Sequence, residues 1–147
     1  MQSKTDKALA DFDGNYNCCQ SVIKQFSEDL GISEEFAIKT AAGFGGGMRC
    51  GHTCGVITGS IMVLGLKYGK SQPEQSDKEE LYRIVKEFTE AFVSVHGATH
   101  CKDLIGYDTG TDEGRAKASA EGRFKERCPL FIKTAISLLE EYESNPI

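Results

Sequence analysis

The residues of this sequence best suited to chemistry are its six cysteines. Four of them stand beside residues that cap or open helices: Asn17-Cys18, Thr53-Cys54, Cys101 two residues after Thr99, and Cys128-Pro129. At a helix N-terminus, the free N–H groups and the helix dipole lower the pKa of a thiol. Because the thiolate is the form of cysteine that binds metals and attacks disulfides, these four residues predict one redox or metal site.

The leading hypothesis is that Cys18, Cys54, Cys101 and Cys128 are the ligands of one metal centre, either an iron–sulfur cluster or zinc. Their long separations match no local zinc ribbon or ferredoxin run, so only tertiary folding can bring them together. The sequence has no C-x-x-C-H motif, and no haem is expected. Whether such a centre makes the chain an enzyme, an oxidoreductase, or an electron-transfer protein stays open at this stage.

Two alternatives do without a metal. In the first, Cys54 is a catalytic low-pKa thiol, and Cys50 or another cysteine is its resolving partner in thiol–disulfide chemistry. In the second, the cysteines are small apolar residues in the core of a helical binding or scaffold protein, because free cysteine is among the most buried residue types.

The segment 54–69 is the element that must position these residues. Its apolar residues point in almost every direction at helical pitch, which predicts a buried central helix, and it is too short to span a membrane. Gly55 and Gly59 lie four residues apart on one face, where they allow a neighbouring backbone to come close. A glycine-rich loop, residues 44–52, leads into this helix.

Helical patterns on both sides of the central segment predict an all-α fold, a compact bundle of about five to seven helices. The expected helices cover residues 18–30, 33–42, 77–96 and 99–105 and a last helix opened by Cys128-Pro129, with a turn or two near 8–12 and 115–120. Val95 and Leu130 are expected on buried faces. We expect one domain over residues 1–147, with its core at about 14–143.

The net charge of −5 argues against nucleic acid as the main partner. No basic amphipathic segment suggests a membrane surface. The first residues show no apolar stretch of a signal peptide, so we expect a cytoplasmic protein whose cysteines are reduced, metal-bound or redox-active. The expected partner is an unidentified redox partner, and the apolar content is compatible with a homodimer.

The order of the motifs resembles the C-GCAxxG-C-C family of redox-active proteins over residues 14–140. The resemblance rests on Asn17-Cys18, Phe44-Gly-Gly-Gly, Cys54-Gly-Val-Ile-Thr-Gly59, Cys101-Lys-Asp-Leu-Ile-Gly and Cys128. It implies that the family's four cysteines are the four named above, in an electron-transfer or cysteine-ligated cluster site. Val56 replaces the motif's Ala, which changes packing only. The family is also similar to part of the split-Soret c-type cytochromes, but this chain lacks the haem motif, so haem is not implied.

Overall fold

The computed structural model describes residues 2–144 and confirms the predicted all-α class. In this part of the chain, eight α-helices and one short turn (η1) are joined by loops, and the only β-type pairing is a single bridge between Thr53 and His100. The elements are α1 (Lys4–Asp13), α2 (Cys18–Lys24), α3 (Glu34–Ala41), η1 (Gly47–Gly51), α4 (Gly55–Tyr68), α5 (Gln75–His96), α6 (Cys101–Ile105), α7 (Asp112–Ala120) and α8 (Arg123–Ser144). None of the helices described is long and apolar enough to cross a membrane.

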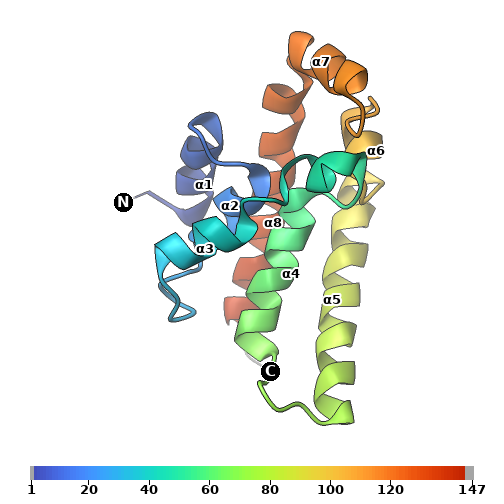
Figure 1. Ribbon diagram of the computed structural model, residues 1–147. Coiled ribbons are helices and arrows are strands. Elements are labelled where there is room, and N and C mark those ends of the chain that lie inside the picture. The colour runs from blue at the N-terminus through green and yellow to red at the C-terminus, as the bar shows by residue number, and fades with distance from the viewer. Residues whose placement is uncertain (1, 145–147) are drawn as a thin grey trace.

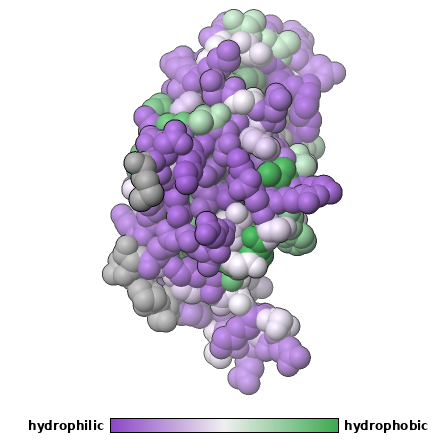
Figure 2. Space-filling model, turned by 90° about the vertical axis from the view of Figure 1, so that its left-hand side faces the viewer, coloured by the Kyte–Doolittle hydropathy of each residue, from purple (hydrophilic) through white to green (hydrophobic). Residues whose placement is uncertain are grey.

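The long helices α4, α5 and α8 pack on one another along the length of the molecule, and α6 and α7 lie at one end of them (Figure 1). Helix α2 packs against α4, while α1 and α3 in turn pack against α2. The side of the molecule that carries α1 to α3 is mostly hydrophilic on its outside (Figure 2). Because α4 contacts α2, α5 and α8, it is the central helix, although Leu66 on its outer face is exposed.

Two glycines of α4 set its distance from α2. A β-carbon at position 59 would lie 2.9 Å from the carbonyl oxygen of Cys19, and one at position 55 would lie 2.5 Å from Sγ of Cys18. Atoms do not pack this closely, so any side chain at either position would push α2 away from α4. The close backbone approach expected at Gly55 and Gly59 is therefore present, and the first turn of α2 is the backbone that approaches.

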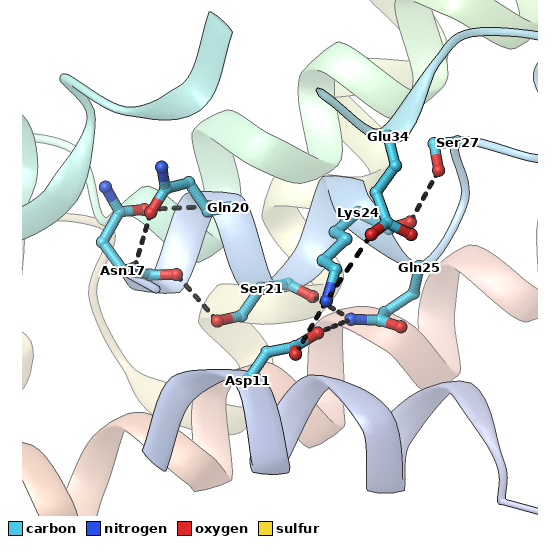
Figure 3. A network of polar contacts seen from close by, with 8 residues as sticks. All are labelled: Asp11, Asn17, Gln20, Ser21, Lys24, Gln25, Ser27 and Glu34. Carbon is cyan, nitrogen blue, oxygen red and sulfur yellow. Dashed lines mark hydrogen bonds and ion pairs between the residues drawn. The ribbon is translucent and has the colours of Figure 1, made fainter. Parts of the chain in front are cut away.

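Side-chain hydrogen bonds fix the short helix α2 at both ends (Figure 3). At its start, Oδ1 of Asn17 accepts from the backbone N–H of Gln20 (2.8 Å), and Oε1 of Gln20 accepts from the N–H of Asn17 (2.9 Å). At its end, Nζ of Lys24 lies 2.9 Å from a carboxylate oxygen of Asp11 in α1. The capping box leaves Cys18 as the first residue of the helix, in a fixed position.

Several expected boundaries differ from the structure. The predicted helix over 18–30 ends at Lys24 and continues as turns, while the turn expected near 115–120 is the full helix α7, capped by the Thr111 hydroxyl. The expectation that Val95 and Leu130 are buried is wrong, since they are 63% and 48% exposed. The packed face of α5 follows every fourth residue to Phe92 and leaves Val95 outside.

We expect Gly59→Ala to lower the free energy of unfolding by about 1–3 kcal/mol, because the new β-carbon would overlap the backbone of α2 at Cys19. Gly65→Ala, in the same helix, is the matched control, since nothing lies within 4 Å of its β-carbon. That variant should gain about 0.5–1 kcal/mol from helix propensity. Urea unfolding followed by circular dichroism measures both values, and a similar change in the two variants would contradict the close approach.

Candidate functional site

The structure brings together the four cysteines that the sequence singled out. Their side chains line one cavity of about 180 Å³, and each residue is between 5% and 8% exposed. Cys18 begins α2, Cys54 immediately precedes α4, Cys101 begins α6 and Cys128 lies in α8. Apolar side chains form most of the remaining wall. Four thiols from four separate elements therefore share one partly enclosed, largely apolar space.

The helix-start argument holds for three of these cysteines and is wrong for the fourth. Cys18 follows the cap Asn17, Cys101 is the first residue of its helix, and Cys54 is itself the N-cap residue of α4. Cys128 lies inside α8, because that helix begins at Arg123 and includes Pro129. A proline inside a helix removes one backbone hydrogen bond without ending the helix when packing holds both sides together.

Cys18 is the thiol that ionises most readily. The hydrogen bond from the Cys54 thiol, helped by the backbone N–H groups of Gly46 and Cys19, outweighs burial and lowers the pKa of Cys18 to about 7. The pKa of Cys54 is raised well above its usual value because its thiol donates to Cys18 and is buried. Because the two thiols share this hydrogen bond, they share one readily formed negative charge, and the sequence-based assignment of the reactive thiol to Cys54 stays a prediction.

The other two cavity cysteines stay protonated at neutral pH. Burial raises the pKa of Cys101 and of Cys128, and the negative charge of Cys18 raises both further. The hydroxyl of Thr109 lowers the pKa of Cys101, because it favours the thiolate, but this effect is smaller than that of burial. Thr109 is fully buried and its Oγ1 has no hydrogen-bond partner within residues 2–144, so ionisation of Cys101 would provide one.

A short backbone pairing places Cys54 and Cys101 next to each other. The N–H of Cys54 donates to the carbonyl of Thr99 (2.8 Å), and the N–H of Cys101 donates to the carbonyl of His52 (2.7 Å). No local pattern in the sequence predicts this bridge, because a single residue pair carries no alternation of apolar and polar residues. It fixes the helix starts of α4 and α6 relative to each other.

The glycine-rich loop before α4 has an unusual left-handed backbone. Gly46, Gly47, Met48 and Arg49 have φ values of 63°, 63°, 58° and 60° in succession. Met48 and Arg49 are costly in this region, by about 1–3 kcal/mol each. At Gly47 no side chain fits, since a β-carbon would lie 2.4 Å from the carbonyl oxygen of His52. This path brings Gly46 to the cavity wall, where its N–H reaches Cys18.

The two remaining cysteines lie elsewhere. Cys50 is exposed in the loop and does not line the cavity. Cys19 is fully buried against α4, where the hydroxyl of Thr58 lies 3.7 Å from its Sγ, and burial raises the pKa of Cys19 to about 12. Cys19 is therefore a core residue of the α2–α4 contact.

The donors fit a cysteine-ligated centre in number and in chemistry, because four sulfur atoms line one cavity. The buried Thr109 hydroxyl beside Cys101 also favours a thiolate there. Their present arrangement is not that of a ligand set, since no group of three or more Cys, His, Asp or Glu side chains within residues 2–144 is placed to hold a metal ion. Binding a metal would therefore require these side chains to move.

The comparison with protein families agrees with the motif order. Over residues 16–142 the chain matches the family described as "Putative redox-active protein (C_GCAxxG_C_C)", and the matched range contains all four cavity cysteines. No curated protein and no solved structure matches the chain. Since the family match covers most of the sequence, the expected relationship is confirmed, and the chain belongs to the C_GCAxxG_C_C family.

Proposed function

We propose that the four cavity cysteines form one electron-transfer centre, in which their sulfur atoms are the ligands of an iron–sulfur cluster or another metal. The observation that carries the proposal is the cavity itself, where four thiols from separate elements meet. Apart from the cysteines, none of the residues described along its wall is ionisable. Cysteines that served only as small apolar core residues would not need to line a common cavity.

The electrostatics of the cavity support this proposal. Near neutral pH, Cys18 is the cavity thiol that ionises. Its negative charge, together with burial, opposes ionisation of the other three thiols. A bound cation reverses this opposition, since each thiolate is then attracted to the metal. When bound, an iron–sulfur cluster would supply reversible one-electron chemistry. The N–H groups at Cys18 and the hydroxyl of Thr109 would donate to the sulfur atoms.

Protein purified without oxygen should contain iron and acid-labile sulfide and should absorb visible light. Changing any one of Cys18, Cys54, Cys101 and Cys128 to Ser should remove most of both, because a ligand is lost. Cys50→Ser is the matched control and should keep the wild-type content, since Cys50 lies outside the cavity. Metal analysis and visible spectra measure these outcomes.

If the protein contains zinc in place of iron and the same four variants lose it, the proposal of a metal site is supported, but electron transfer by that site is refuted. Metal content that does not change in any of the four variants would refute the metal site altogether.

The hydrogen bond from Cys54 to Cys18 favours a second candidate, metal-free thiol–disulfide exchange. The Cys18 thiolate would attack a substrate disulfide and form a mixed disulfide, while the other substrate sulfur leaves with a proton. Cys54 would then lose its proton and attack Cys18 Sγ, which closes a Cys18–Cys54 disulfide and releases the second substrate thiol. Two electrons pass from the protein to the substrate. The geometry favours Cys18 over the exposed Cys50 as the partner of Cys54.

The second candidate predicts a pH dependence. In the reduced, metal-free protein, the rate of Cys18 alkylation by iodoacetamide should rise with pH around a midpoint of about 7, because only the thiolate reacts. Cys54→Ala removes the donor that stabilises the thiolate, so the pKa of Cys18 and the midpoint should move to higher pH. Peptide mass spectrometry of pH series measures the rate, with Cys50→Ala as the control. A midpoint that stays in place in Cys54→Ala would show that the pair does not interact.

A further inference from the structure

The cavity of the four cysteines has a definable rim. Most residues along its wall are buried, and the four partly exposed ones are Phe12, Asn17, Gly46 and Phe124. These four come from α1, the start of α2, the glycine-rich loop and the first turn of α8. They are the part of the wall that is most exposed to solvent.

Two of the four rim residues cannot move aside. The side chain of Asn17 is held by its cap bond to Gln20 (2.8 Å) and by a hydrogen bond from its Nδ2 to the carbonyl of Ala42 (3.1 Å). Gly46 has no side chain to rotate. The rings of Phe12 and Phe124 are therefore the movable part of the rim, and both lie near helix ends, where local opening costs least.

The same two rings face a second hollow on the outside. A groove of about 610 Å³ lies between α1 and the start of α8, and Phe12 and Phe124 are the residues that it shares with the cysteine cavity. Asp13 and Lys125 are the charged residues along this groove. The outer groove and the inner cavity thus meet across two aromatic side chains.

We propose that Phe12 and Phe124 form the entrance to the four-cysteine cavity and exclude anionic reactants. Beyond the rings the wall is apolar, with Leu104, Ile105 and Phe131 beside the sulfur atoms and no cationic side chain that would pair with an incoming anion. An anion that enters such a space loses its water without compensation. The inference rests on the proposed function only in that the cavity cysteines are the reacting groups, whether metal-bound or free.

The test uses the reduced, metal-depleted full chain, which should titrate as six thiols once unfolded. It is treated with three methanethiosulfonates of similar length that carry a hydroxyethyl, a trimethylammonioethyl or a sulfonatoethyl group. Each transfers its thioalkyl group to a cysteine thiolate as a mixed disulfide and releases methanesulfinate. Peptide mass spectrometry gives the rate at Cys18, and exposed Cys50 gives the reactivity of an open site. Relative to Cys50, Cys18 should react at least ten-fold faster with the uncharged reagent than with the anionic sulfonatoethyl one.

Variants of the two rings should change this selectivity. Phe12→Ala and Phe124→Ala should each speed the reaction of Cys18 with the sulfonatoethyl reagent at least ten-fold and leave Cys50 unchanged. Phe36→Ala is the matched control, since Phe36 is 58% exposed on α3 and away from the rim. Phe124→Trp, which enlarges the ring without opening a gap, should slow the uncharged reagent at Cys18.

The inference is overturned if the sulfonatoethyl and hydroxyethyl reagents reach wild-type Cys18 equally fast relative to Cys50. It is also overturned if the two alanine variants act no more strongly than Phe36→Ala, or if Phe124→Trp speeds the reaction. Failure of the proposed function is a separate result, because it would show as unchanged metal content and an unchanged alkylation midpoint while the selectivity of the entrance persists.

Discussion

The site depends on one steric constraint, the contact between the backbones of α2 and α4 at Gly55 and Gly59. Because neither glycine has a β-carbon, the first turn of α2 rests directly on α4, and Sγ of Cys18 occupies the space that a side chain at position 55 would need. Cys54 is the neighbour of Gly55, so this contact also sets the hydrogen bond between the two thiols. The C-G-x-x-x-G spacing in the sequence thus encodes a packing distance before it encodes any chemistry.

Burial and mutual repulsion explain why the cavity holds one thiolate rather than four. Cys18 has hydrogen-bond donors that Cys101 and Cys128 lack, namely the Cys54 thiol and the N–H of Gly46. Once Cys18 is charged, a second thiolate nearby would add repulsion in a space with little solvent, and the pKa of each remaining thiol rises. Two events relieve this arrangement, a cation that several sulfur atoms share or oxidation of two thiols to a disulfide. The second is a redox reaction, in agreement with the family description.

The sequence was sufficient for the fold class, the central helix and the choice of the four cysteines, because caps, glycine spacing and helical periodicity are local signals. Asn17 shows this well, since it caps α2 as expected. Cys128 belongs to the cavity for a reason the sequence did not reveal, as Pro129 lies inside α8 and does not start it. The donors that favour a negative charge in the Cys18–Cys54 pair come from a loop and a helix distant in sequence, so no local signal in the sequence reveals them. No propensity predicts Met48 and Arg49 in the left-handed region.

The cysteines lie mainly at the ends of short elements, while the long helices form a support. A helix as short as α2 or α6 is not stable by its own hydrogen bonds, so its position has to come from neighbouring groups. Asn17 and Lys24 hold α2, and the bridge at Thr53 and His100 holds the start of α6 against that of α4. The left-handed loop adds a further fixed donor, the N–H of Gly46. Its unfavourable backbone conformation is held in place by the closely packed backbone around it. Each sulfur atom is therefore positioned by its own set of local contacts, and a change in one set can displace one cysteine without unfolding the bundle.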